Sequence, residues 1–348
     1  YRDFFILEDA EDGETILARR FLYTDQMNIR HGVQFTYKNM RYSLTRALAY
    51  HYLMADGTPF QSQEGWQTMQ YNAEFTNRDP RMAQTIAGPD YVALGSDASI
   101  KYNPSCKDYD RSGYRPIKYF SDDTHDGAST STTDYAIIRY GEVLLNYAEA
   151  KAELGEADQT VIDETVNVIR TRVGMPGLDA AKANAAPDSF LCSYYTDKHL
   201  DGPDKGLILE VRRERTVELV NEGFRLWDML RWHEGQQLCP ASNTLGPGFI
   251  GCWFPGLGEY DMNNDGVPDL CIYSDKKPSS DCENMLNVAP GKDNTLSEGT
   301  SGYLVQFKDQ TYKWEEKDYL YPIPQKQIQI YPKDETTGQS VLTQNPGY

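Results

Sequence analysis

The clearest candidate for a chemical site in this sequence is a loop in which oxygen donors recur at every second position. Counting from Asp261 as position 1, Gly266 is at position 6, where calcium-binding loops turn sharply. The expected ligands of a Ca²⁺ ion are Asp261, Asn263, Asp265, the carbonyl of Val267, and Asp269. Position 12 is Ile272, so the bidentate acid of an EF-hand must come from elsewhere or be replaced by water. The alternative is a solvated turn rich in Asn and Asp. A calcium ion bound here would brace a long loop and would not react.

No residue pattern indicates catalysis. The histidines have no neighbours that would complete a metal motif or a triad; they are His31, His51, His125, His199 and His233. The sequence also contains no nucleophile elbow and no glycine loop for phosphate. Glu142 and Glu149 lie two turns apart on one predicted helix, roughly 10 Å at 1.5 Å per residue. No water-positioning residues accompany them, so we expect a protein that is not an enzyme.

The cysteines likewise form no motif for metal or redox chemistry. The six are Cys106, Cys192, Cys239, Cys252, Cys271 and Cys282. They contain no C-x-x-C pair and no Cys/His cluster with the spacing of a zinc site. Four of them lie in a Gly- and Pro-rich stretch, which suits one or two loop disulfides in an oxidising compartment. Buried free thiols are the alternative.

Length and charge limit the class of protein. The chain has 348 residues, enough for a sizeable core. With 52 acidic and 34 basic residues, its net charge of −18 repels phosphate backbones and argues against a nucleic-acid partner. No apolar run approaches the ~20 residues that a membrane-spanning helix needs.

The elements that must position these residues are predicted to be mostly helical. Apolar residues at helical spacing predict helices over 45–53, 140–154 and 159–172, and one unusually long helix over 206–234. The pair 140–154 and 159–172, separated by Gly155, forms a helical hairpin of the tetratricopeptide-like kind. Such a hairpin cannot bury its own apolar face, so its partners must come from elsewhere.

Strands and loops make up the rest of the prediction. Residues 14–21 are expected to be extended, and short strands are expected over 303–307 and 319–323. Two regions, 58–134 and 240–302, are rich in turn formers and are predicted to be long loops. Because long irregular loops in folded proteins are usually functional, these two are the candidate ligand- and metal-bearing regions.

Charged residues on the predicted helices are expected to form ion-pair networks between helices. They are Glu142, Glu149, Arg212, Arg213, Arg215, Glu218 and Arg225. Three tryptophans in helix or strand contexts are expected in the core: Trp227, Trp232 and Trp314.

Several of these segments resemble the SusD/RagB-like family of outer-membrane nutrient-binding lipoproteins. Residues 139–150 (RYGEVLLNYAEA) and 168–175 (VIRTRVGM) are similar to its first signature, in which Ala is usual in place of Val173. The segments 210–219 and 222–232 resemble its second signature, and 321–325 with 342–348 resemble its carboxy terminus. Residues 77–81 and 112–114 match two weaker landmarks. Together these landmarks cover the chain from residue 77 to its end.

The resemblance implies an α-superhelix of tetratricopeptide-like hairpins with long irregular loops and a few short strands. We expect residues 1–348 to form a single SusD-like domain that lacks the family's amino-terminal helical part. The family's lipidated cysteine is absent as well, so any lipid anchor lies outside this chain. The implied location is the cell outer membrane, as a surface-exposed lipoprotein.

The implied function is non-catalytic capture of an oligosaccharide or polysaccharide for a SusC-like, TonB-dependent transporter. Relatives hold their substrate with aromatic side chains on loops, because the faces of rings stack on apolar sugar faces. The loop aromatics that could do this are Trp66, Tyr91, Trp253 and Tyr260. Packing in the core is the alternative for each. Capture of a peptide is the competing function within the family. The alternative outside the family is a scaffold that binds another protein through its helical repeats.

Overall fold

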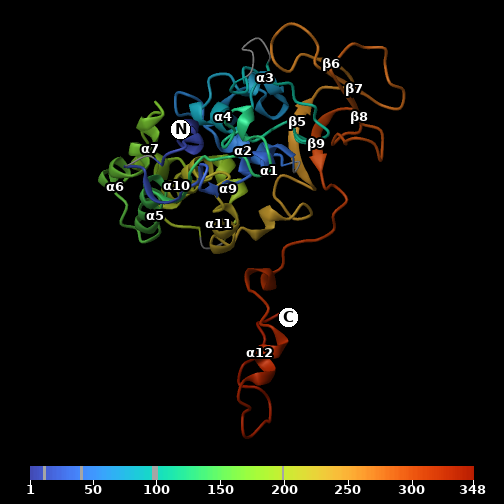
Figure 1. Cartoon of the computed structure of the whole chain (residues 1–348). Helices are drawn as coiled ribbons and strands as arrows, with labels where there is room; N and C mark the ends of the chain where they lie inside the picture. Colours follow the sequence, from blue (N-terminus) through green and yellow to red (C-terminus); the bar gives the residue numbers. More distant parts are fainter. Residues whose placement is uncertain (11–12, 40–41, 96–100, 198–199) are drawn as a thin grey trace.

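Helix α10 (Lys205–Glu218) lies at the centre of the helical part of the molecule (Figure 1). The computed structural model describes residues 1–10, 13–39, 42–95, 101–197 and 200–348. Around α10 pack α2 (Arg46–His51), α5 (Tyr140–Glu153), α8 (Ala180–Ala185) and α9 (Ser189–Tyr194). All of its residues except Lys205 and Glu210 are buried. Its many charged side chains therefore need partners inside the protein.

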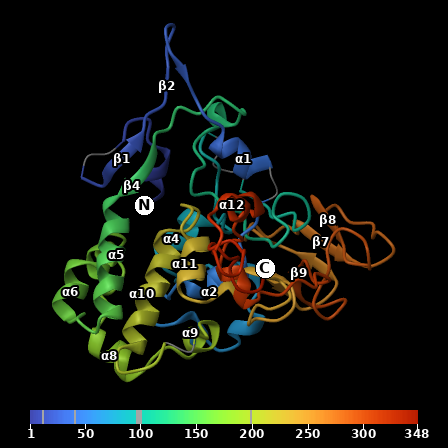
Figure 2. The same ribbon diagram turned by 90° about the horizontal axis from the view of Figure 1, so that it is seen from below.

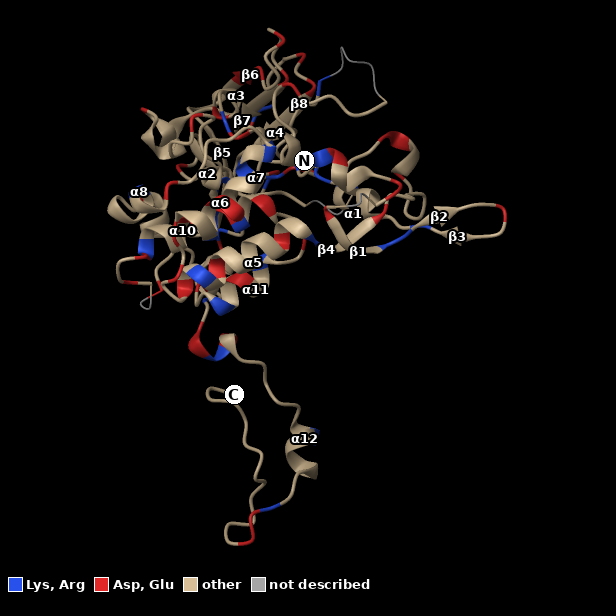
Figure 3. Cartoon of the chain, turned by 90° about the vertical axis from the view of Figure 1, so that its left-hand side faces the viewer, with Lys and Arg blue, Asp and Glu red and all other residues tan. Residues whose placement is uncertain are grey.

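A buried ion-pair network supplies those partners. The Glu214 carboxylate lies 2.6 Å from Arg81 and 2.8 Å from Arg170. The Glu218 carboxylate lies 2.9 Å from Arg139 and 3.0 Å from Arg81. These arginines belong to α4 (Pro80–Thr85), α7 (Val166–Arg172) and β4 (Tyr135–Arg139). The network thus fixes three elements from distant parts of the sequence against α10, and Figure 3 shows acidic and basic residues lying together on the neighbouring helices.

The expected ion pairs are confirmed for most of the helical charges. Those that form one are Glu149, Arg212, Arg213, Arg215 and Glu218. The expectation was wrong for Glu142 and Arg225, neither of which has an ion-pair partner among the described residues. Glu142 accepts a hydrogen bond from Asn146 at 3.4 Å, and Arg225 donates to the Thr216 hydroxyl at 2.9 Å. The Arg225 guanidinium lies among the hydroxyls of Tyr194, Tyr195 and Thr216, so neutral oxygens take the place of a carboxylate.

The predicted helical hairpin is present, with one break in its second arm. After α5, Gly155 adopts a left-handed φ of 68°, and α6 (Gln159–Glu164) then begins at the Asp158 side chain, which accepts from the Val161 amide. Residues 159–172 form α6 and α7 instead of one helix, since Thr165 leaves helical geometry (ψ −89°). The inward face of α5 carries Leu144 and Ala148, which the predicted apolar stripe includes, and also Leu145, which it does not include. Val143 and Tyr147, also expected in the apolar stripe, are instead 41% and 45% exposed, so the stripe is only half covered.

The prediction of a single long helix over 206–234 was wrong. The structure has α10, which ends at Glu218, and α11 (Arg225–Arg231), joined by a turn. In that turn Asn221 and Gly223 have φ values of 63° and 93°. Left-handed backbone at two positions cannot continue an α-helix, although the apolar spacing runs through the break unchanged.

The remaining helices are short and surround this centre. The α-helices are α1 (Val33–Asn39), α3 (Tyr71–Glu74) and α12 (Gln325–Ile330). The 3₁₀ helices are η1 (Arg2–Ile6), η2 (Phe60–Ser62), η3 (Trp66–Thr68), η4 (Asp123–His125), η5 (Gly235–Leu238) and η6 (Glu316–Tyr319). The expected helix over 45–53 is confirmed as α2. Within the described ranges no helix has both the length and the apolar character needed to cross a membrane.

Strands form small sheets at the edges of the helical part. Antiparallel pairs join β1 (Thr15–Arg19) to β4, β2 (Leu22–Tyr23) to β3 (Asn28–Ile29), and β5 (Phe249–Phe254) to β9 (Gly302–Gln306). A fourth sheet has β7 (Leu270–Tyr273) between antiparallel β6 (Gly258–Tyr260) and parallel β8 (Asn284–Asn287). The extended segment over 14–21 and the strand over 303–307 are confirmed by β1 and β9.

Two expectations about strands were wrong. The region 240–302 was expected to be loop, yet it carries β5 to β8, and most of β7 is buried without the alternation that marks a surface strand. The strand expected over 319–323 is instead unpaired chain that follows η6. Pro322 and Pro324 lack the amide hydrogens that a ladder needs.

Residues beyond η6 form an arm that projects from the body (Figure 1). Seen from below, the helices α5 and α10 lie on one side of this arm and β7 to β9 on the other (Figure 2). The Tyr319 ring stacks on His233 at 4.2 Å, and its hydroxyl accepts from the Gly235 amide at 3.0 Å. Beyond Leu320 the chain folds back on itself, where Asn345 donates to the Tyr321 carbonyl at 2.6 Å.

Candidate ligand-binding and metal-binding loops

Trp66 is held by a short 3₁₀ turn at the edge of the helical part. Gly65 precedes it with a left-handed φ of 69°, which starts η3. The half-buried Trp66 ring meets the buried Tyr50 ring edge-on, with 5.1 Å between the centroids. From beneath, the Arg46 guanidinium donates to the Met69 carbonyl at 2.9 Å, which fixes the end of the turn.

Trp253 lies next to this turn on the β5–β9 pair. It is the cross-strand partner of Tyr303, so both side chains are on the same face of the ladder. The Tyr303 hydroxyl donates to the Gln67 carbonyl of η3 at 2.7 Å, which ties the ladder to the turn. Two of the four predicted aromatics thus come from elements in contact. We call Trp66, Trp253 and Tyr303 the aromatic shelf.

A buried charge pair lies under the aromatic shelf. Arg46 and Glu74 form an ion pair and are 0% and 1% exposed. The Arg46 guanidinium lies 5.1 Å from the centroid of the Tyr303 ring, within range of a cation–π contact. Burial raises the pKa of Glu74, and the charge of Arg46 works against that shift. The pair holds the shelf in place from below and is closed to solvent.

The other two predicted aromatics lie elsewhere. Tyr91 packs edge-on against Tyr102 with 6.2 Å between centroids, and the Arg2 guanidinium is 5.4 Å from its ring. Tyr260 packs against Phe254 at 5.0 Å, and its hydroxyl donates to the Gly256 carbonyl at 2.6 Å. The structure therefore places both in local packing. Tyr303 was missed among the candidates because it was expected only as a strand residue, and strand pairing alone brings it opposite Trp253.

Of the three tryptophans expected in the core, one is buried, one is half-buried and one is exposed. Trp232 is 2% exposed and donates to the Glu149 carboxylate at 2.5 Å. Trp314 is half-buried against Tyr319, with 5.3 Å between the ring centroids. Trp227 is 56% exposed on α11, so its assignment to the core was wrong. The break after Glu218 turns this helix so that Trp227 faces away from the body.

The predicted calcium loop folds around its own backbone. Asp261 Oδ2 accepts from the Gly266 amide at 2.8 Å, and Asp265 Oδ1 accepts from the Val267 amide at 2.8 Å. Asp269 Oδ2 accepts from the Met262 amide at 2.8 Å across the mouth of the loop. These hydrogen bonds hold the carboxylates of Asp261, Asp265 and Asp269 against amides of the loop, but they do not bring the three carboxylates together. Among the described residues, the three Asp side chains do not form a group whose ligand atoms all lie within 4.8 Å.

Asp269 gives the loop its electrostatic character. It is only 5% exposed, and burial raises its pKa, with the charges of Asp265 and Asp261 adding to the shift. The donors are carboxylate, amide and carbonyl oxygens, which suit a hard cation. Ile272 at position 12 is buried in β7 and offers no oxygen from its side chain. The donor types are those that Ca²⁺ prefers, although the three carboxylates do not converge on one point.

Neighbouring segments fix the loop in place. The Asn72 amide donates to the Asp261 carbonyl at 2.6 Å, and Asn263 donates to Asn103 Oδ1 at 2.6 Å. Lys101 Nζ donates to the Asn263 carbonyl at 3.0 Å. The loop therefore connects both predicted loop regions, 58–134 and 240–302.

Two hollows lie apart from the shelf and the loop. The first, about 300 Å³, is lined mainly by apolar side chains of residues 44–48, 219–224 and 238–250, Leu48 and Phe224 among them, while α10 and α11 contribute polar side chains. The second is an open polar groove of about 650 Å³ between residues 291–295 and 305–312. Neither lining includes Trp66 or Trp253.

Two groups that could perform acid–base chemistry, Glu149 and His51, are engaged. Glu149 receives two hydrogen bonds of 2.6 Å from Arg231. His51 lies in the core between the Ala47 carbonyl and the Tyr195 hydroxyl, and burial holds its pKa well below the ordinary value. These contacts are structural and leave no free general acid or base at either residue.

Comparison with known proteins gives a consistent result. The sequence matches the SusD family over residues 23–348. The structure is similar to a SusD-like protein from Bacteroides fragilis, with a TM-score of 0.57 and 21% identity over 100% of this chain and 57% of that protein. A SusD-like carbohydrate-binding protein from the same organism gives a TM-score of 0.56 and 23% identity over 90% of this chain and 52% of the other. The chain therefore spans little more than half the length of these proteins. No curated protein matches it.

Proposed function

Because this chain belongs to the SusD family, we propose that it is a non-catalytic binding protein that captures an oligosaccharide or polysaccharide at the cell surface. It would pass the glycan to a SusC-like, TonB-dependent transporter in the outer membrane. A lipid anchor would hold it at the membrane as a surface-exposed lipoprotein. One structural neighbour is a carbohydrate-binding protein, which supports the choice of ligand class.

The aromatic shelf is the observation that carries this proposal. The rings of Trp66, Trp253 and Tyr303 are half-buried, so each is anchored and still keeps part of its surface open. Sugar rings have apolar faces that stack on such surfaces, while polar neighbours bind the hydroxyls. Gln67 and Thr68 are exposed beside Trp66 and supply such polar groups.

The character of the shelf favours a glycan over a peptide. An acidic lining with few rings would suit a peptide, whereas here three rings form the shelf, the Tyr303 ring lies over the cation of Arg46, and Glu74 is buried. A glycoside hydrolase would need two convergent carboxylates in a cleft. Glu74 has a raised pKa, but at 1% exposure it cannot reach a substrate.

We also propose that Ca²⁺ binds in the loop 261–269 with a structural role. Its ligands would be Asp261, Asn263, Asp265, the Val267 carbonyl and Asp269. The nearness of Asp261 and Asp265 to the buried Asp269 supports this assignment, because a bound cation would offset the mutual repulsion of these carboxylates.

Calorimetry with glycan and peptide libraries tests the main proposal. We expect a glycan ligand, and we expect Trp66→Ala and Trp253→Ala each to weaken its binding about tenfold, or ~1.4 kcal/mol. Trp227→Ala is the matched control, since this tryptophan is exposed on α11 and should leave the affinity unchanged. Binding of peptides but no glycan, or equal affinities in all three variants, would refute the proposal. Co-purification with an outer-membrane barrel tests the partner separately.

A further inference from the structure

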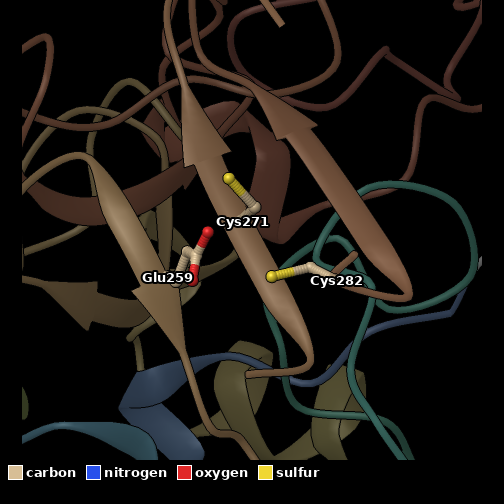
Figure 4. A group of neighbouring side chains, drawn as sticks. All are labelled: Glu259, Cys271 and Cys282. Atoms are coloured by element: carbon tan, nitrogen blue, oxygen red, sulfur yellow. The ribbon is translucent and has the colours of Figure 1, made fainter. Parts of the chain in front are cut away.

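Three side chains that are distant in the sequence meet on the β6–β7–β8 sheet. Glu259 of β6 is the cross-strand partner of Cys271 of β7, so both lie on the same face of the sheet. Cys282 comes from the connection that leads from β7 into the parallel strand β8. One ligand atom of each residue, a carboxylate oxygen and two Sγ atoms, lies within 4.8 Å of the other two (Figure 4).

The surroundings of this group offer polar contacts but, among the described residues, no ion-pair partner. Cys271 is 2% exposed, so its side chain is closed to solvent. Within the described ranges, Glu259 has no salt-bridge partner. Ser280 Oγ donates to Cys282 Sγ at 3.2 Å, so the neighbouring polar group offers a hydroxyl and no positive charge. A cation among the three ligands would balance the carboxylate and let the two thiols bind as thiolates.

The ligand set selects the class of cation. Two thiolates are soft ligands, and with one carboxylate they suit Zn²⁺, which forms Zn–S bonds of about 2.3 Å. Tetrahedral ligands at that bond length lie about 3.8 Å apart, so small rotations of these side chains would close the site. The Ser280 hydroxyl or a water would complete the fourth position. Sulfur makes up two of its three side-chain ligands, which separates this site from the all-oxygen loop 261–269.

We propose that Glu259, Cys271 and Cys282 form a binding site for a thiophilic divalent cation of the zinc class. The ion ties the connection 274–283 to the sheet and so fixes the edge next to β8. The site is independent of the glycan and of Ca²⁺. A disulfide between the two cysteines is the competing chemistry, but such a bond gives no role to the carboxylate of Glu259.

The test uses the full chain, reduced, freed of metal and titrated with Co²⁺. We expect one equivalent to produce the near-ultraviolet charge-transfer band of a thiolate–cobalt bond, and Zn²⁺ to abolish it. Cys282→Ser should remove the band, and Glu259→Gln should weaken Co²⁺ binding at least tenfold. Cys239→Ser removes a thiol outside the cluster and should change nothing. Because Cys239 is buried, circular dichroism without metal checks that each variant is folded.

Two outcomes would overturn the proposal. The first is a wild-type protein without the charge-transfer band, or a band that persists in Cys282→Ser. The second is a disulfide-linked peptide containing Cys271 and Cys282 in unreduced protein, together with an affinity for Co²⁺ after reduction that Glu259→Gln does not change.

Discussion

At the scale of single residues, Glu218 shows how charges are accommodated in the core. Its carboxylate is 0% exposed and is within 3.0 Å of Arg81, Arg139 and Arg172. Burial alone would raise its pKa, but the three guanidinium groups hold it well below the ordinary value. Removing one partner from such a group leaves buried charges uncompensated.

We therefore expect Glu218→Gln to lower the free energy of unfolding by about 3–5 kcal/mol in urea titrations. The folded-state pKa of Glu218 is depressed, so its contribution is fully present above the unfolded pKa of about 4.3 and is lost as pH falls through the folded pKa. The variant should consequently lose less stability than wild type as the pH falls from about 5 to about 2, because this range lies between the unfolded and the depressed folded pKa of Glu218. The exposed Glu164→Gln is the control and should stay within about 0.5 kcal/mol. A stability of Glu218→Gln equal to that of the control would contradict the network's role.

At the scale of elements, the loop 261–269 combines a strict local pattern with anchoring from outside. Its side chains cap its own amides, and Asn72 and Asn103 hold it from the other loop region. An ion bound here would stabilise both regions at once.

We expect Ca²⁺ at a hundredfold excess over its Kd to stabilise the folded chain by about 2.7 kcal/mol, and EGTA to reverse the effect. Calorimetric melting with and without the ion measures it. Asp261→Asn and Asp265→Asn should abolish the shift. Asp275→Asn makes the same charge change in the nearby 274–283 connection, at a φ of 63° that Asn tolerates, and should keep the shift. Equal stabilisation in all variants would point to nonspecific binding.

At the scale of the whole molecule, the carboxy-terminal arm is distinct from the body. Its apolar side chains Tyr321, Ile330 and Val341 are 66%, 73% and 57% exposed. The contacts that join it to the body are concentrated at η6, around Tyr319.

Limited trypsin digestion should therefore cut first at Lys326 and Lys333, which are exposed on the arm. Lys118 is buried in the body and should stay uncut. Because the arm beyond residue 320 contributes little to the body's core, a chain ending there should melt within a degree or so of the full chain. A large fall in Tm would show that the arm packs on the body in solution.

The sequence by itself determined those features that depend on neighbouring residues. Apolar spacing located α2, α5 and most of α10, and the repeated Asp and Asn residues located the loop 261–269. The family signatures identified the SusD family, and the comparison confirms it over residues 23–348. Periodicity, caps and motifs are local properties, and they can be read along the chain.

Only the tertiary structure decided which distant residues meet. Trp253 faces Tyr303 because β5 pairs with β9, and Cys271 faces Glu259 because β7 pairs with β6. Their spacings in sequence carry no signature, since strand register is set by the burial of whole faces and not by local pattern. The break before α11 was also missed, because the apolar spacing continues through it. Left-handed backbone at Asn221 and Gly223 lets α11 leave the axis of α10.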